Sequence, residues 1–384
     1  MTIKEDKVKK KKDFSKKWYT EKFLNELKNT AYQEKDKNLV YTVKCSPDAV
    51  SKYGLDPRML GGPIGKMAKG LQFVPDFIFK HMNMKLNENN IISFRESCSK
   101  ISYADCHING VEITNSAVLA SDSHKIPIRI YQNNTCKNTK ALLIFIHGGA
   151  FVGGTIDPYD ECLKMLVDKF SIKALSIDYR LLPENPYPTP YTDCFDVVEY
   201  IYNNHYEFDT DKDKIFVCGD SAGGNLAQAC STKFKGNDMI RGQLLLYPTL
   251  NIFAIEDEYY HTGLDDFTFE PTQKRLSIGV IRQMQMLTNC DVKQIGITAP
   301  DEFNSPYIYS AKGNPPTFIT AGALDYLKKD AMAWAHKLTD AGVKTNLLIY
   351  NGLGHGYINA TGVFPQAEDL IDEMGNFINS IIKQ

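Results

Sequence analysis

The sequence predicts an α/β fold, in which a mainly parallel central sheet is flanked by helices and carries a helical cap. Two observations lead to this prediction. From Ala141 onward, strand-like apolar runs alternate with helix-compatible segments, which is the pattern of parallel strands joined by crossover helices. Several of these runs, such as Leu142–Ile146 and Ile215–Cys218, lead directly into glycine-containing loops, as buried strands do where they leave a sheet.

The composition fits one enzyme domain with insertions. A chain of 384 residues exceeds the usual size of a single domain, but α/β folds reach this length when a lid is inserted. The formal net charge of -2 gives no electrostatic reason to expect a nucleic acid as partner. Nine cysteines without a C-x-x-C pair indicate scattered reduced thiols. Because the chain carries no P-loop, dinucleotide or H-E-x-x-H fingerprint, we expect no cofactor and no metal.

The N-terminal residues 1–17 are rich in lysine and lack the apolar segment of a signal peptide or a membrane span. We expect a disordered basic arm, with contact of Lys9–Lys12 to an anionic surface as the alternative. A cytoplasmic enzyme without a membrane span is the simplest interpretation.

The rest of the chain divides at changes in the pattern of apolar residues. Helical patches surround a turn-rich centre before residue 90, and an aromatic, acidic interval with a helix-like run, Arg275 to Met286, interrupts the alternation after Pro248. The predicted intervals are the N-terminal part of a helical cap (18–89), the first part of the core (90–250), the cap insertion (251–311) and the second part of the core (312–384).

The start of the core is expected to be antiparallel. From Ile91 to Gln132 the residues indicate antiparallel strands, and Ile126, Ile128 and Ile130 alternate with more polar positions. Proline has no N–H for a ladder, so Pro127 within this run predicts an edge strand.

Ser221 is the predicted nucleophile. It lies in a G-x-S-x-G turn, Gly219 to Gly223, between a strand-like run and a helix-compatible stretch. Glycines on both sides of a serine allow a bend sharp enough to present its hydroxyl, and the helix that starts there directs N–H groups toward a reacting carbonyl. The turn therefore predicts nucleophilic catalysis by serine.

A second glycine loop, His147 to Gly154, follows the apolar run that ends at Ile146. Such a loop can turn backbone N–H groups toward a ligand, because no bulky side chain blocks the approach. Together with the N–H of Ala222, the N–H groups of Gly149 and Ala150 form the predicted oxyanion hole, and Gly148 shapes the loop.

His355 and Asp325 complete the predicted triad. A serine nucleophile needs a histidine base, and that histidine needs a carboxylate to orient it. Of the eight histidines, His355 alone lies between glycines in a loop after a strand-like run, and Asp325 follows another such run, Pro316 to Gly322. The chain order serine, aspartate, histidine is the one expected when the nucleophile lies on a G-x-S-x-G turn.

These motifs give the chain a resemblance to the hormone-sensitive-lipase-like branch of the α/β-hydrolase family, which contains esterases and lipases. The resemblance implies an α/β-hydrolase fold, short or medium acyl chains and a hydrophobic pocket. Two positions depart from the family pattern: Ala150 stands where the family usually has a third glycine, and Leu182 stands where alanine is common. The methyl group of Ala150 puts in doubt whether a bulky alcohol group has room beside the oxyanion hole. The motifs are His147-Gly148-Gly149-Ala150-Phe151, Asp178 to Pro188, Gly219 to Gly224, Tyr247-Pro248, Gly322 to Leu327 and Gly354 to Tyr357.

Three further polar residues in these motifs are expected to be structural. Asp178 and Arg180 follow a predicted strand and are expected to join loops through an internal ion pair. Asp220 precedes the nucleophile and is expected to brace the neighbouring glycine loop.

The sequence thus predicts a serine carboxylesterase that hydrolyses short- to medium-chain acyl esters of small molecules through an acyl-enzyme. An amide deacetylase or a lactonase with the same triad is the alternative within the enzymes. The alternative outside the enzymes is a ligand receptor on the same scaffold, because one fold can carry unrelated functions. Whether the protein is a monomer or a homo-oligomer stays open.

Overall fold

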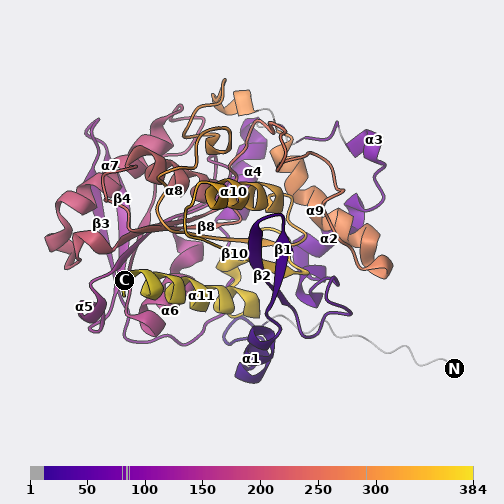
Figure 1. Cartoon of the computed structure of the whole chain (residues 1–384), viewed down its shortest axis with the longest axis horizontal. Coiled ribbons are helices and arrows are strands. Elements are labelled where there is room, and N and C mark those ends of the chain that lie inside the picture. The colour runs from indigo at the N-terminus through magenta and orange to yellow at the C-terminus, as the bar shows by residue number, and fades with distance from the viewer. Residues whose placement is uncertain (1–12, 80, 84, 86, 291, 384) are drawn as a thin grey trace.

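The computed structural model describes residues 13–383 except 80, 84, 86 and 291, and a ten-stranded sheet lies at its centre (Figure 1). The strand order is β1-β2-β10-β9-β8-β7-β5-β6-β4-β3. All neighbours from β2 to β6 pair in parallel, whereas β1 is antiparallel to β2, β4 is antiparallel to β6 and β3 is antiparallel to β4. This confirms the predicted α/β fold. The strands are β1 (Tyr32–Asp36), β2 (Leu39–Cys45), β3 (Glu112–Leu119), β4 (Lys125–Gln132), β5 (Leu142–Ile146), β6 (Lys173–Ile177), β7 (Ile215–Asp220), β8 (Gly242–Leu246), β9 (Thr317–Gly322) and β10 (Thr345–Asn351).

Helices cover both faces of the sheet, which explains why its central strands are apolar throughout. Every residue of β5 to β9 is buried. Figure 1 shows α7, α8 and α10 on one face and α6 and α11 on the other. These helices are α6 (Asp160–Phe170), α7 (Thr189–Asn203), α8 (Ala222–Lys233), α10 (Lys328–Asp340) and α11 (Pro365–Ile382).

Two helices that are far apart in the sequence pack closely beside the sheet, α2 (Gly62–Leu71) and α9 (Lys274–Thr288) (Figure 1). Gly279 makes the close crossing possible, because a Cβ at this position would lie 2.2 Å from the backbone oxygen of Ala68. The two intervals predicted as parts of a cap therefore contact each other. The remaining α-helices of the described chain are α1 (Glu21–Asn29), α3 (Asp76–Phe79), α4 (Glu88–Cys98) and α5 (Cys136–Thr139).

The prediction that residues 18–89 belong wholly to a helical cap is wrong. Residues 32–45 form the hairpin β1–β2, and β2 pairs in parallel with β10 and so extends the main sheet. Leu39 and Val43 are buried there, so the hairpin completes the core. Helix α1 packs on α11 rather than over Ser221.

The prediction of a disordered arm over residues 1–17 is wrong for residues 13–17. Residues 1–12, with the run Lys9–Lys12, lie outside the described residues, but 13–17 contact the folded chain. The ammonium of Lys17 lies 2.8 Å from the carboxylate of Glu368, and the backbone oxygen of Phe14 accepts a hydrogen bond from the N–H of Asp105. A buried carboxylate at Glu368 gives this segment a partner that the local sequence does not reveal.

The antiparallel region also differs from the prediction. Strands β3 and β4 pair as expected, but residues 88–98 form helix α4, whose N-terminus is capped by Asn87. Strand β4, which contains Pro127, is not at the edge, since β3 lies outside it. Proline is tolerated because the β4–β6 ladder begins only at Ile128, so that no ladder N–H is needed at Pro127. None of the helices among the described residues is long and apolar enough to cross a membrane.

Candidate active site

Ser221 lies on a sharp turn between β7 and α8. Its backbone has φ 56° and ψ -118°, a conformation that costs free energy and persists where the surroundings enforce it. The flanking glycines are required by close backbone contacts. A Cβ at Gly219 would lie 2.1 Å from the oxygen of Gly223, and a Cβ at Gly223 would lie 2.0 Å from the oxygen of Ile146. The G-x-S-x-G pattern thus meets a steric demand of this turn.

The structure brings Ser221, His355 and Asp325 together from three loops. These loops follow β7, β10 and β9, and the carboxyl ends of parallel strands meet at one edge of a sheet. The Ser221 Oγ lies 3.0 Å from Nε2 of His355, and Nδ1 of His355 lies 2.7 Å from Oδ2 of Asp325. Because a carboxylate accepts, Nδ1 donates to Asp325 and Nε2 is free to accept the serine proton.

Asp325 holds this arrangement from a fully buried position. Its Oδ1 accepts a hydrogen bond from the N–H of Leu327 at 2.9 Å, which leaves Oδ2 directed at His355. Burial lowers the pKa of His355, but the charge and the hydrogen bond of Asp325, with a further contribution from the charge of Asp220, outweigh it, so that the pKa is raised above its ordinary value. A histidine paired with a carboxylate in this way is suited to hold a proton that it takes from a serine, because the carboxylate stabilises the imidazolium.

The raised pKa of His355 predicts the acid limb of the pH profile. Only neutral imidazole accepts a proton, so activity toward a short ester is expected to fall as the pH drops through the pKa of His355. The midpoint of kcat/KM is expected above the ordinary value of 6.5. The same midpoint should appear in NMR titration of the His355 ring in Ser221→Ala, and a kinetic midpoint that this ring does not follow would contradict the assignment of the base.

The predicted oxyanion loop lies beside Ser221. Gly149 has φ 129°, and a Cβ there would lie 2.1 Å from the oxygen of Gly153. Ala150 has φ 53°, so alanine occupies a left-handed conformation that glycine adopts more easily. The N–H groups of Gly149, Ala150 and Ala222 donate to no other group within the described part of the chain. Ala222 begins helix α8, whose N-terminus also favours negative charge.

Gly148 is not a free donor. Its N–H donates to Oδ1 of Asp220 at 2.7 Å, and the hydroxyl of Tyr159 donates to Oδ2 of the same carboxylate at 3.2 Å. Asp220 thus braces the glycine loop, as its position before the nucleophile predicts. Burial raises the pKa of Asp220 to about 6, although the hydrogen bonds from Gly148 and Tyr159 oppose this shift.

Arg95 makes contacts near this loop that the sequence does not reveal. It lies on α4, and its Nε donates to the backbone oxygen of Val152 at 2.6 Å. Its two terminal nitrogens donate to the carboxylate of Glu184, and one of them also to the oxygen of Leu182. Arg95 therefore joins the oxyanion loop to the loop after β6. No motif surrounds Arg95 in the sequence, and only Glu184 lies within a motif.

The ion pair predicted between Asp178 and Arg180 is wrong. Arg180 instead contacts Asp193 at 2.6 Å and Asp122 at 2.7 Å. A fully buried carboxylate at Asp193, on α7, needs a cation more than the half-exposed Asp178 does. Asp178 faces His147, whose pKa burial lowers to about 4 and which is therefore neutral at pH 7.

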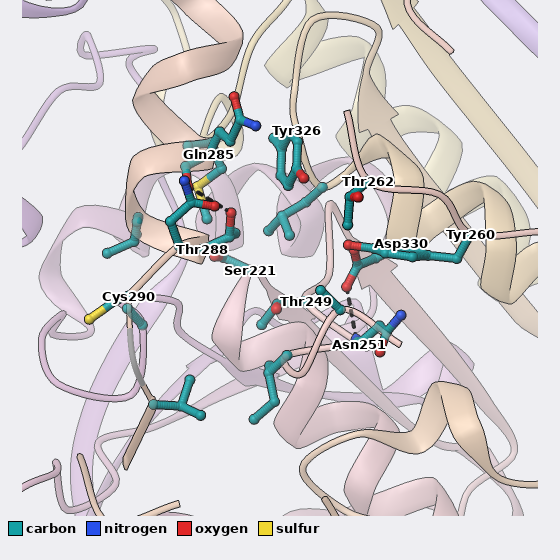
Figure 2. A pocket seen from close by; sticks show the side chains of 18 of the residues that line it. Ser221, Thr249, Asn251, Tyr260, Thr262, Gln285, Thr288, Cys290, Tyr326 and Asp330 are labelled. Atoms are coloured by element: carbon teal, nitrogen blue, oxygen red, sulfur yellow. Dashed lines mark hydrogen bonds between the residues drawn. The ribbon is translucent and has the colours of Figure 1, made fainter. Parts of the chain in front are cut away.

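A cavity of about 450 Å³ opens at Ser221. Its wall is formed by Ala150 of the oxyanion loop, the loop after β8, the end of α9 and the start of α10, and Figure 2 shows the side chains that line it. Met284 and Leu287 of α9 contribute apolar surface. A substrate bound at Ser221 therefore contacts both the sheet edge and the helix that packs on α2.

Within the described residues, no three histidine, cysteine, aspartate or glutamate side chains are grouped so that they could hold a metal ion. Six of the nine cysteines are buried free thiols: Cys45, Cys136, Cys162, Cys194, Cys218 and Cys230. The polar groups around Ser221 are those of an acyl-transfer site: a hydroxyl, an imidazole, a carboxylate and unpaired backbone N–H groups.

Comparisons with known proteins agree with this geometry. Residues 143–359 match the model of a family described by the alpha/beta hydrolase fold. The chain is 27% identical to an arylesterase of Saccharolobus solfataricus over 70% of this chain and 84% of the relative. It is 29% identical to carboxylesterase NlhH of Mycobacterium tuberculosis over 64% of this chain and 75% of the relative.

The solved structures support the same fold. A hyperthermophilic esterase from the archaeon Pyrobaculum calidifontis superimposes with a TM-score of 0.63 and 24% identity, covering 85% of this chain and 98% of that one. The family match spans more than half of the chain and includes the turn at Ser221, Asp325 and His355. The chain therefore belongs to the α/β-hydrolase family, and its predicted resemblance to the hormone-sensitive-lipase-like esterases is confirmed.

Proposed function

We propose that the protein is a serine carboxylesterase that hydrolyses short- to medium-chain acyl esters through an acyl-enzyme on Ser221. The esterase and carboxylesterase names of its relatives support the class of reaction, a carboxylic ester hydrolysis. The observation that carries the mechanism is the continuous chain of hydrogen bonds from Ser221 through His355 to Asp325. A cytoplasmic location stays a prediction from the sequence.

In the proposed reaction, the Ser221 Oγ attacks the ester carbonyl carbon while its proton passes to Nε2 of His355. The carbonyl oxygen becomes an oxyanion that accepts hydrogen bonds from Gly149, Ala150 and Ala222. Collapse of this intermediate breaks the bond to the alcohol, which leaves with the proton from His355. Water then repeats the sequence on the acyl-enzyme, with His355 as base, and releases the carboxylic acid and free Ser221.

A panel of p-nitrophenyl esters with increasing acyl length tests this proposal, run beside acetylated amides and lactones. We expect a burst of p-nitrophenol equal to the enzyme concentration whenever deacylation is slower than acylation. Mass spectrometry of the quenched reaction should then find the acyl group on the peptide that contains Ser221. Hydrolysis of amides or lactones in preference to every ester would contradict the carboxylesterase assignment.

We also propose that α2 and α9 act as a cap that limits the length of the acyl group. The contact of the two helices at Gly279 and the place of Met284 and Leu287 in the cavity wall support this role. A cavity of about 450 Å³ is at the small end of ligand pockets. Activity should therefore peak at short acyl chains and decline as the chain outgrows the cavity.

Gly279→Leu tests the cap. The new side chain cannot fit against the Ala68 oxygen, so α9 must move relative to α2. We expect the ratio of kcat/KM for a long to a short acyl ester to change by about 10-fold, the value of one or two methylene contacts. The measurement is the chain-length profile of the folded variant.

Arg275→Leu is the matched control, because it places the same side chain on the exposed side of α9. Its chain-length profile should equal that of the unaltered protein. If Gly279→Leu folds and keeps the same profile as well, α2 and α9 do not set the acyl length.

A further inference from the structure

A second carboxylate lines the cavity that opens at Ser221. Asp330, on α10, is only 2% exposed and belongs to the cavity wall. Its Oδ2 accepts hydrogen bonds from the backbone N–H groups of Leu250 and Asn251, at 2.7 and 2.9 Å. No N–H or O–H of another described residue donates to its Oδ1. Figure 2 shows that this oxygen points away from Asn251.

Asp330 has no cationic partner among the described residues. The two lysines that precede it in the sequence are used elsewhere. Lys329 lies 2.6 Å from the carboxylate of Asp266, and Lys328 donates to the backbone oxygen of Asp266 at 2.9 Å. Burial is the main cause that raises the pKa of Asp330 to about 7, and the charge of Asp325 adds to it. A buried carboxylate without a cation is costly, so a cation in the cavity would be bound favourably.

The rest of the wall combines apolar surface with hydrogen-bond acceptors. Thr262 faces the cavity, and its hydroxyl donates to the carboxylate of Glu256, which leaves the lone pairs of the Thr262 oxygen available. Glu256 also brings a second negative charge to this part of the molecule. Such a wall suits an alkyl chain that ends in a positively charged hydrogen-bond donor. The apolar side chains are Ile252, Met284, Leu287 and Ile295, and further polar ones are Thr249 and Gln285.

We infer that Asp330 is a specificity residue that selects esters carrying a primary ammonium group at the end of a short alkyl chain. The ammonium donates to the free Oδ1 of Asp330, while the ester carbonyl lies at Ser221. This substrate class rests on the proposed esterase function of the same cavity. Oδ2 meanwhile continues to hold the loop after β8 through Leu250 and Asn251.

The test compares pairs of phenyl esters in which a terminal methyl group is replaced by an ammonium group of similar size, over a series of chain lengths. At about pH 8 the amine is charged, and Asp330, whose pKa is about 7, is mostly deprotonated. We expect kcat/KM to favour the ammonium ester by about 10- to 100-fold at the best length, the value of a charge-assisted hydrogen bond. A ratio of one or less at every length would overturn the proposal.

Asp330→Asn should reduce this preference by about 10-fold or more, because asparagine keeps an oxygen for the two backbone N–H groups but removes the charge. Asp266→Asn is the matched control, since it removes the same charge from a residue that pairs with Lys329 outside this cavity. Its preference should equal that of the unaltered protein. A folded Asp330→Asn variant with an undiminished preference would also overturn the proposal.

Binding to Ser221→Ala separates this inference from the proposed reaction. By calorimetry, n-alkylammonium ions should bind this variant about 10-fold or more tightly than alkanols of the same length. This arm needs no catalysis and no Asp330 variant, so it also decides the matter if Asp330→Asn does not fold. Absence of Ser221-dependent hydrolysis of any ester would refute the esterase proposal, whereas hydrolysis with equal binding of ammonium ions and alkanols would refute only the role of Asp330.

Discussion

Replacing Ser221 with alanine is expected to lower kcat toward an acetyl ester by a factor on the order of 10⁶ and to abolish labelling by a fluorophosphonate. The change removes the one oxygen that can attack the carbonyl, while the base and the N–H donors remain. Ser221 Oγ makes a hydrogen bond only to His355 within the described residues, so the variant should keep its fold and its melting temperature. Steady-state kinetics, gel-based labelling and thermal unfolding measure these three outcomes.

Ser231→Ala is the matched control. Ser231 lies on the same helix, α8, is buried, and its hydroxyl has no hydrogen-bond partner in the described structure. Its activity and labelling should be unchanged. A folded Ser221→Ala variant that still turns over and still reacts with the fluorophosphonate would show that another residue is the nucleophile.

His355→Ala should lower kcat nearly as much as Ser221→Ala, and the double variant should be no slower than Ser221→Ala alone. The reason is that the serine and the base act as one unit, so the two losses do not add. Losses that do add would mean that His355 does not activate Ser221.

The sequence was sufficient for the features that depend on local backbone geometry. The turn at Ser221 and the loop at Gly149 each need glycine because another backbone passes within 2.1 Å of a Cβ position. These close contacts exclude a Cβ, so glycine is visible in the sequence at these positions. The alternation of strands and helices then indicates that the loops meet at one edge of the sheet. Asp325 and His355 were predictable for another reason, since each lies in the loop that follows a strand of the sheet.

Features that depend on distant partners were not predictable. Strand β2 joins the sheet because β10, about three hundred residues later, offers it a free edge. Arg95 contacts the oxyanion loop, and Asp330 faces the cavity, only because helices from distant parts of the chain are packed there. The spacing of apolar residues within one segment of the chain does not indicate which distant segment it will contact.

The second large effect is expected from Gly149→Ala, which should lower kcat by about 10² to 10³, the cost of one lost oxyanion donor. A Cβ at this position meets the Gly153 oxygen at 2.1 Å, and φ of 129° is unfavourable for alanine. The loop must therefore move, and the N–H groups of Gly149 and Ala150 move with it. The KM for the ester should change much less, because the donors contact the oxyanion more closely than the ground-state carbonyl.

Affinity for a trifluoromethyl ketone distinguishes this cause from general damage, because Ser221 converts the ketone into a tetrahedral oxyanion. Its inhibition constant should rise in proportion to the loss of kcat/KM. Gly342→Ala is the control: Gly342 also has a positive φ, 74°, but a Cβ there has no atom within 4 Å. This variant should lose stability by about 1 kcal/mol and keep its kcat. If Gly149→Ala folds with its kcat and its ketone affinity intact, the loop after β5 does not stabilise the oxyanion.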